Sequence, residues 1–383
     1  MTVTLKTVPE RPVQRRRPAA LARVAEAARS GPGLFVVVAL LLLAVAPLAL
    51  EPFRLNLLAK YLCYAIVALG IGLAWGRGGM LTLGQGVFFG VGGYSMGMYL
   101  KLNDAGGELP DFMVWSGVET LPALWAPFRS PAFALAAAVV LPVAIATVLG
   151  LLVFRRRVRG AYFAILTQAL AAALVILLVG QQGLTGGTNG LTNFFELFGQ
   201  DLAADGTQRG LYFVVAITLG VLFLFAWQLA RSRFGRLLVA VRDAEDRVRF
   251  LGYDPAVVKT ITFAAAAGMA GIAGALFVPV VGIISPALLG VVPSLEFVVA
   301  VAVGGRYALG GAVLGAVLMN YAKTAFSEEF AGGWLYLQGA LFILVMTLAP
   351  GGVAGLLASA RDAVARWRRA RPGWAAREAK EAA

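Results

Sequence analysis

The sequence contains no histidine and only one cysteine, Cys63, among its 383 residues. The absence of histidine excludes Ser-His catalytic triads, His-ligated metal sites and imidazole proton relays. A single cysteine allows no disulfide within the chain and no zinc cluster built from thiolates. The sequence also lacks the G-x-x-x-x-G-K-[ST] phosphate loop, so it cannot hold ATP by that device. We therefore expect no catalytic site, no metal and no cofactor bound by this chain.

Charged residues are also scarce, at 14% of the chain, whereas 60% of the residues are hydrophobic and the mean hydropathy is +0.80. Crossing a hydrocarbon core of ~30 Å takes about 20 helical residues. The apolar runs predict an all-α polytopic membrane protein of about ten spans. The Gly-rich run 81–100 can also be re-entrant, and 291–304 is short and contains Glu296. The ten predicted spans are 34–50, 57–75, 81–100, 132–153, 161–180, 211–230, 260–284, 291–304, 309–326 and 334–350.

The distribution of Lys and Arg predicts the orientation of these spans, because basic residues gather in cytoplasmic segments. If the N-terminus is cytoplasmic and all ten spans cross, 27 of the 33 basic residues lie inside. The net charge of +13 then reflects membrane orientation, and we expect no nucleic-acid partner. We predict a basic cytoplasmic N-terminal tail, 1–33, a transmembrane domain, 34–350, and a basic cytoplasmic C-terminal tail, 351–383.

One mixed-charge block, 231–255, interrupts the apolar runs with "RSRFGRLLVAVRDAEDRVRFLGYDP". We call it the coupling segment. Its apolar residues recur at three- and four-residue steps, which predicts an amphipathic cytoplasmic helix over 236–251. Gly252 is expected to end this helix and Pro255 to prevent its resumption. The predicted apolar stripe consists of Phe234, Leu237, Leu238, Val241, Ala244, Val248 and Leu251.

The charges of the coupling segment favour one of two roles for the predicted helix. A basic amphipathic helix can lie on the lipid surface. Here four acids alternate with six bases, and Asp243–Arg247 and Glu245–Arg249 form acid-first i,i+4 pairs. The acids weaken attraction to anionic lipid, so the pattern favours docking of the apolar stripe in a groove of another protein.

The coupling segment is also one of four stretches that carry a family resemblance. All four resemble permeases of ABC importers for branched-chain amino acids and urea. They are residues 234–255, "GGMLTLGQGVFFGVGGYSMGMYL" (78–100), "GLTGGTNGLTNF" (183–194) and "VGGRYALGGAVLGAVLMNY" (303–321). The resemblance extends from about 55 to 357. It implies a multi-pass protein of the bacterial inner membrane that forms a translocation path.

Two stretches resemble the urea-type branch of that family, "AYFAILTQALA" (161–171) and "AKTAFSEEFAGGWLYLQGALFILV" (322–345). They favour urea as the substrate, with branched-chain amino acids as the alternative. Gly351-Gly352 departs from the Lys-Gly that relatives often have, and it falls in the predicted tail. A stand-alone secondary transporter is a different possibility, but such proteins usually need intramembrane carboxylates or histidines, and only Glu296 qualifies.

The resemblance further implies the partners of this chain and the residues that contact them. A second homologous permease would complete the path, two cytoplasmic ATPase subunits would hydrolyse ATP, and an external solute-binding protein would deliver the substrate. The residues expected to couple the chain to the ATPases are Gly235, Arg236, Val241, Arg242, Asp243, Glu245, Leu251 and Gly252.

Candidate path residues follow from the chemistry of urea, which is neutral and offers four N–H donors and one carbonyl acceptor. Amide and hydroxyl groups suit it better than fixed charges, which are costly in a membrane. For each candidate the alternative is a hydrogen bond to a neighbouring helix. The candidates are Gln85, Thr167, Gln168, Glu296 and Asn320.

Overall fold

The computed structural model describes residues 41–158, 160–329, 333–348 and 351–356. The chain divides into two compact units, Met1–Leu50 and Glu51–Ala383. In the first unit, the π-helical turn η1 (Leu41–Val45) continues into α3 (Ala46–Ala49). The predicted tail 1–33, the first part of span 34–50 and most of the tail 351–383 lie outside the described residues.

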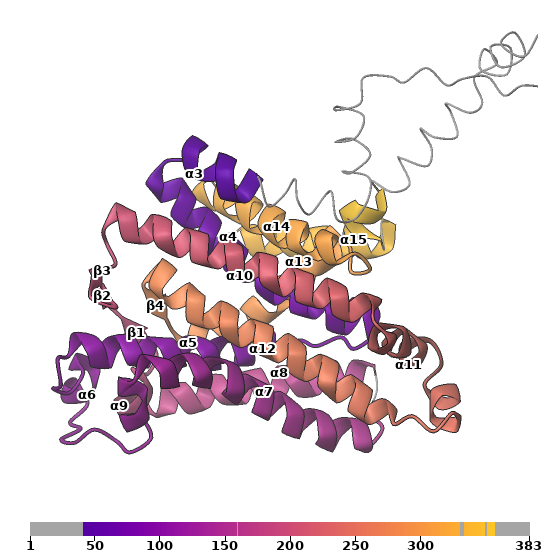
Figure 1. Ribbon diagram of the computed structural model, residues 1–383, viewed down its shortest axis with the longest axis horizontal. Helices are drawn as coiled ribbons and strands as arrows, with labels where there is room; N and C mark the ends of the chain where they lie inside the picture. The colour runs from indigo at the N-terminus through magenta and orange to yellow at the C-terminus, as the bar shows by residue number, and fades with distance from the viewer. Residues whose placement is uncertain (1–40, 159, 330–332, 349–350, 357–383) are drawn as a thin grey trace, which may run out of the picture. The chain divides into compact units, whose positions relative to one another are not determined.

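The second unit consists largely of long helices, which confirms the all-α polytopic class (Figure 1). Three of them, α5 (Gln85–Asp104), α14 (Leu309–Glu329) and α15 (Trp334–Leu348), are Gly-rich or short. Among the described residues, the helices of this unit coincide with nine of the ten predicted spans. The six that are long and apolar enough to cross a membrane are α4 (Pro52–Ile71) with η2 (Gly72–Arg77), α7 (Pro131–Arg155), α8 (Ala161–Gly180), α10 (Asp205–Arg231), α12 (Pro255–Val281), and η4 (Pro286–Leu288) with α13 (Val291–Gly304).

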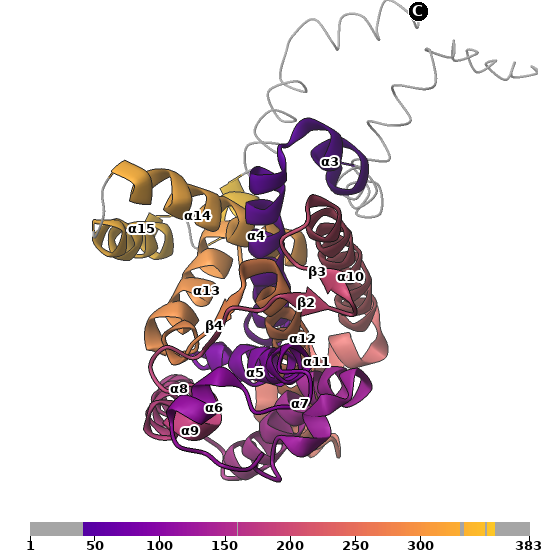
Figure 2. The ribbon, with the colours of Figure 1, turned by 90° about the vertical axis from the view of Figure 1, so that its left-hand side faces the viewer.

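Helices α4, α5 and α12 form the centre of this unit, and the other long helices surround them (Figure 2). Glycines allow the central backbones to touch, because a Cβ atom on Gly274 of α12 would overlap the carbonyl oxygen of Phe89 on α5. A Cβ on Gly92 of α5 would likewise overlap the carbonyl of Gly271. Such close backbone approach is the usual way in which helices associate in lipid.

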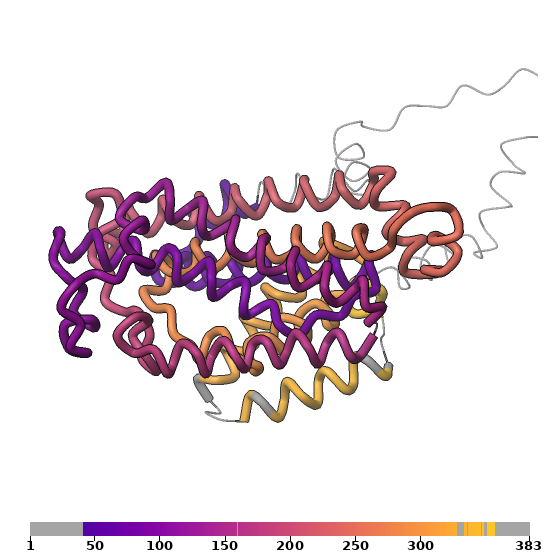
Figure 3. The backbone as a smooth tube through the Cα atoms, turned by 90° about the horizontal axis from the view of Figure 1, so that it is seen from below, coloured from indigo at the N-terminus to yellow at the C-terminus, as the bar shows by residue number. Residues whose placement is uncertain are grey.

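The connections between the long helices gather at two opposite ends of the unit (Figures 1 and 3). At one end, helix α11 (Arg233–Phe250) lies beside the α4–α5 and α7–α8 connections. These are predicted inner segments, so their gathering is what alternate crossing requires. The opposite end holds α6 (Asp111–Trp115), η3 (Ala126–Arg129), α9 (Gln182–Thr185) and two antiparallel strand pairs, β1 (Leu191–Thr192) with β4 (Ile283–Ile284) and β2 (Glu196–Leu197) with β3 (Gln200–Asp201).

The Gly-rich third span forms helix α5, which begins within the bundle and ends at the α6 end of the unit (Figure 1). It begins at Gln85, four residues later than predicted. The residues before it are non-helical and partly buried within the unit, and Thr82 has no solvent exposure. This stretch gives the middle of the bundle an irregular backbone, which membrane proteins tolerate only where other protein or water surrounds it.

The coupling segment forms the predicted helix, but α11 is not continuous. Ala244 has φ −152° and ψ 68°, which breaks α11 into two arms. Gly252, with φ +87°, follows the second arm as predicted. The coupling helix does not resume after Gly252, and Pro255 instead starts a separate helix, α12, five residues before the predicted start of that span. The Asp254 carboxylate accepts a hydrogen bond from the Ala256 N–H at 2.9 Å, and a proline without an N–H fits the first helical turn.

Candidate functional site

The apolar stripe of the coupling segment packs against the chain's own helices. Leu238, Val241 and Val248 are buried together with Val258 of α12. Leu251, the last residue of the predicted stripe, is instead 76% exposed. The expectation that the whole stripe docks in a partner's groove therefore needs correction, because the ends of α4 and α12 already cover most of it.

The first arm of α11 is tied to the end of α4 by Arg242. Its Nη1 donates to the carbonyl oxygen of Gly76 at 2.8 Å, and its Nε donates to Asp243 Oδ1 at 2.8 Å. This hydrogen bond from the guanidinium lowers the pKa of the exposed Asp243 carboxyl. Asp243 thus pairs with its neighbour rather than with Arg247, since the break at Ala244 separates the predicted i,i+4 partners.

The second arm is tied to α12 by an ion pair that the sequence did not suggest. Lys259 Nζ lies 2.6 Å from Glu245 Oε2, and these side chains are only 10% and 11% exposed. Arg249 also lies 3.6 Å from Glu245, so the predicted i,i+4 pair is present. Removing one partner of such a sheltered pair is costly, because the remaining charge loses its compensation. The two arms are therefore anchored to different helices.

The residues predicted to couple the chain to ATPases divide into internal and accessible groups. Gly235 is buried at the α10–α11 turn, where a Cβ would overlap the Ala230 carbonyl, and Val241 is 1% exposed. Arg242 and Glu245 make the anchoring contacts described above. Arg236, Asp243, Leu251 and Gly252 are exposed. Sequence reasoning missed Phe250, which is 92% exposed beside Leu251.

A cavity of about 640 Å³ lies between α11 and the ends of the surrounding helices. Arg242, Asp243 and Glu245 line it from α11, and Lys259 lines it from α12. Residues of the α4–α5 and α7–α8 connections complete its wall. The cavity surrounds the break in α11 at Ala244. This break lies between Arg242, which anchors the first arm, and Glu245, which anchors the second.

Two of the predicted path residues, Gln85 and Thr167, lie together inside the unit. Thr167 Oγ1 accepts a hydrogen bond from the Leu83 N–H at 3.1 Å, and both Gln85 and Thr167 are 1% exposed. Neither amide atom of Gln85 has a hydrogen-bond partner among the described residues. Gln168, the next residue on α8, is half-buried beside the exposed face of that helix. The structure therefore brings Gln85 and Thr167 together but leaves Gln168 apart from them.

The remaining path candidates, Glu296 and Asn320, line a cavity of about 210 Å³ among α4, α13, α14 and α15, which we call the α13–α15 cavity. Lys323 Nζ of α14 donates to both oxygens of Glu296 at 2.7 Å. Asn320 Nδ2 donates to the Ala316 carbonyl of its own helix at 2.8 Å. Sequence reasoning missed this ion pair, because Lys323 lies 27 residues from Glu296 in the sequence.

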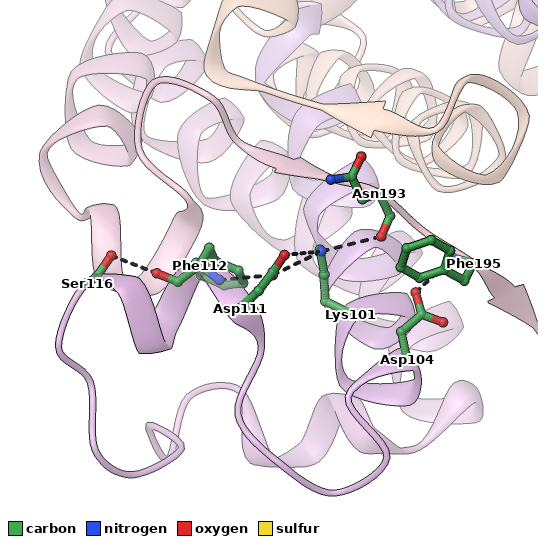
Figure 4. A network of polar contacts seen from close by, with 7 residues as sticks. All are labelled: Lys101, Asp104, Asp111, Phe112, Ser116, Asn193 and Phe195. Carbon is green, nitrogen blue, oxygen red and sulfur yellow. Dashed lines mark hydrogen bonds and ion pairs between the residues drawn. The ribbon is translucent and has the colours of Figure 1, made fainter.

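The end of the unit opposite α11 is held by a polar network around Lys101 (Figure 4). Lys101 is 6% exposed, and its Nζ donates to Asp111 Oδ1 at 3.0 Å and to the Asn193 carbonyl at 3.4 Å. The Asp104 carboxylate accepts hydrogen bonds from the N–H groups of Phe195 and Glu196 at 2.9 and 3.1 Å. The network fixes α5, α6 and the β1–β2 segment as one surface.

Comparisons with known proteins agree with this architecture. Residues 53–349 match the model of the family described as "Branched-chain amino acid transport system / permease component". The permease LivM of Escherichia coli, from a high-affinity branched-chain amino acid transport system, is 28% identical over 340 residues, 83% of this chain and 74% of LivM. BraD of Pseudomonas aeruginosa, named for the same kind of system, is 27% identical over 143 residues, 37% of this chain and 46% of BraD.

A shorter similarity links the chain to the autoinducer 2 import permease LsrC of Salmonella typhi, which is 36% identical over 109 residues, 28% of this chain and 31% of LsrC. No solved structure matches the chain significantly. The family match extends over well more than half of the sequence and covers the helices from α4 to α15. The chain belongs to the family of branched-chain amino acid transport system permeases.

Proposed function

We propose that this chain is the transmembrane permease subunit of an ATP-driven importer for branched-chain amino acids. The observation that carries the proposal is the similarity to LivM across 83% of the chain. BraD, a second similar protein, is also named for branched-chain amino acids. The urea-type motifs at 161–171 and 322–345 are a resemblance of short stretches only. Branched-chain amino acids, the alternative in the sequence analysis, are therefore better supported as the substrate than urea.

Uptake measurements on the complete transporter test this proposal. The chain would be reconstituted in proteoliposomes with its partner permease, ATPases and binding protein, and supplied with labelled leucine or labelled urea. We expect ATP-dependent uptake of leucine but not of urea. Uptake of urea alone would reverse the substrate assignment, and uptake of either one by this chain without ATPases would contradict an ATP-driven importer.

A second permease is the partner that best fits the exposed side of this chain. Only 22% of the apolar span in α8 is buried within the chain, and Ile165, Ile176 and Leu177 point outward from it. Gln168 lies beside this outward face. A path between two permeases would be bordered by helices of this kind, with lipid covering the rest of their surface.

The coupling segment is the proposed contact with the ATPase subunits. Phe250 and Leu251 form an exposed apolar tip beside Gly252, and aromatic and aliphatic side chains of this kind anchor protein interfaces. A push on this tip would reach α12 through Glu245 and Lys259, because that ion pair holds the second arm of α11. Arg236 and Asp243 are exposed charges on the first arm of α11.

The proposed orientation places the α11 end in the cytoplasm and the Lys101 network outside, in the inner membrane of a bacterium. The predicted inner segments, which carry most of the basic residues, support it. A cysteine introduced at position 157 should escape a membrane-impermeant thiol reagent in intact cells, whereas one at 104 should react. Labelling at 157 but not at 104 would refute the orientation.

A further inference from the structure

Three helices bring charged and polar side chains to the α13–α15 cavity from positions far apart in the sequence. Glu296 comes from α13, Lys323 from α14, and Trp334 and Gln338 from α15. Charged groups inside membrane-spanning segments are costly, and they generally face a bundle interior or a water-filled cavity. The Lys323 side chain is nevertheless 42% exposed on the surface of the chain. This face is therefore poorly suited to lipid and suits a partner or an aqueous path.

Two buried polar atoms of the cavity wall lack partners within the described part of the chain. They are the indole Nε1 of Trp334, a donor, and the amide Oε1 of Gln338, an acceptor. Trp334 is 7% exposed and Gln338 is 6% exposed. Buried polar groups without partners are uncommon in native structures, and a bound water or ligand is one explanation for them. The wall thus offers one unused donor and one unused acceptor beside an ion pair.

Apart from Asn320 and the hydroxyl of Tyr64, the rest of the cavity wall is apolar. Tyr64, Leu288, Val292, Phe297 and Met319 line it. Its volume of about 210 Å³ corresponds to roughly seven water molecules at ~30 Å³ each, which suits a small solute. A wall of this composition favours a solute that is charged at one end and branched and aliphatic at the other.

We propose that the α13–α15 cavity binds the zwitterionic head of an aliphatic amino acid during its passage, an inference that rests on the proposed function. The ammonium group of the solute binds Glu296, and its carboxylate binds Lys323 and the Trp334 N–H. The Gln338 oxygen accepts a second ammonium hydrogen. The aliphatic side chain contacts Val292, Phe297 and Met319.

The ion pair gives this cavity a preference for a zwitterion over a neutral amide such as urea. Without solute, Glu296 and Lys323 neutralise each other, so neither charge is left uncompensated. A zwitterion can replace that pairing with two new ones, whereas a neutral solute offers no full charge to either group.

A double variant, Glu296→Gln with Lys323→Met, tests the proposal without leaving an unpaired charge in the membrane. The complete transporter in proteoliposomes would receive saturating binding protein loaded with leucine, and both leucine uptake and ATP hydrolysis would be measured. Losing hydrogen bonds to charged groups should lower the leucine moved per ATP by about ten-fold or more. Stimulated hydrolysis should persist. Wild-type uptake, or an equal loss of uptake and hydrolysis, would overturn the site.

A second comparison decides the matter if the double variant does not assemble. Trp334→Phe and Trp125→Phe each delete a buried indole N–H that has no partner among the described residues, but only Trp334 lines this cavity. We expect Trp334→Phe alone to lower the leucine moved per ATP, by a few-fold to about ten-fold. Equal behaviour of the two variants would refute the site. Absence of leucine uptake by the wild-type transporter would refute the proposed function instead.

Discussion

Helices α12 and α8 are both long and apolar, yet the fold buries them to very different extents. The fold buries 78% of the apolar span of α12 but only 22% of that of α8, although α8 is the more apolar of the two. Ten of the twelve residues at 264–275 of α12 are glycine or alanine, whereas residues 174–179 of α8 are all large and aliphatic. Small residues allow helices to pack closely within a chain, and large ones cover surfaces that lipid or another subunit contacts. Apolarity therefore marks membrane spans, and residue size indicates which of them lie inside.

The largest expected effect comes from adding bulk to the buried helix. Gly274→Leu places a side chain where even a Cβ would overlap the Phe89 carbonyl, so α5 and α12 must separate. Overpacking a well-packed core typically costs ~1–3 kcal/mol, and overlap with backbone should cost more. We expect little properly folded protein by size-exclusion chromatography in detergent. Ala173→Leu on the exposed face of α8 is the matched control and should fold normally; equal yields of both variants would contradict the comparison.

A smaller effect should follow from loosening the end of α12 where the second arm of α11 is anchored. Lys259→Met removes the ion pair with Glu245, which retains Arg249 at 3.6 Å. We expect a loss of stability on the order of 1–3 kcal/mol, the cost of leaving a sheltered charge with fewer partners. ATP hydrolysis by the complex should respond much less to loaded binding protein.

The double variant Glu245→Gln with Lys259→Met separates coupling from stability in that experiment. It leaves no unpaired carboxylate, so its melting temperature should return toward the wild-type value. Its hydrolysis should still respond poorly to loaded binding protein. A full response in the double variant would mean that the ion pair only stabilises the fold.

The smallest expected effect comes from a substitution beside the exposed face of α8. Gln168→Leu on α8 removes an amide beside the exposed face and should lower substrate uptake by a few-fold to about ten-fold, equivalent to ~0.5–1.5 kcal/mol. Assembly should be unchanged, since α8 makes few contacts within the chain. Ala169→Val, at the neighbouring exposed position, serves as the control. Normal uptake by the assembled Gln168→Leu complex would show that this glutamine has no part in the path.

The long helices were predictable from the sequence because apolar runs alone define them. The predicted spans 161–180 and 291–304 have the bounds observed for α8 and α13. The break at Ala244 was not predictable, since both arms of α11 have helical sequences and the break lies between two tertiary anchors. The later start of α5 at Gln85 likewise depends on contacts with α8 rather than on local pattern.

The candidate sites were predictable only in part. Polarity alone singled out Glu296 and Asn320, and the structure places both at one cavity. The side chains around them could not be predicted, because Lys323 is 27 residues from Glu296 in sequence and Gln338 comes from a third helix. Gln85 looked equally suitable, but its complete burial depends on how the helices pack around it. The sequence identifies which polar residues lie in the spans, but the packing of the helices determines whether each faces a cavity, another helix or the surface.

The burial of Cys63 has a practical consequence for spectroscopy. Its side chain has no solvent exposure in the middle of α4, and it is the only thiol in the chain. Modification requires an accessible thiolate, so the native residue should stay unreactive while the protein is folded. The wild-type sequence is therefore a ready background for pairs of spin labels. Such pairs, one on the α11 tip and one on α12, would report how far the two move apart during a transport cycle.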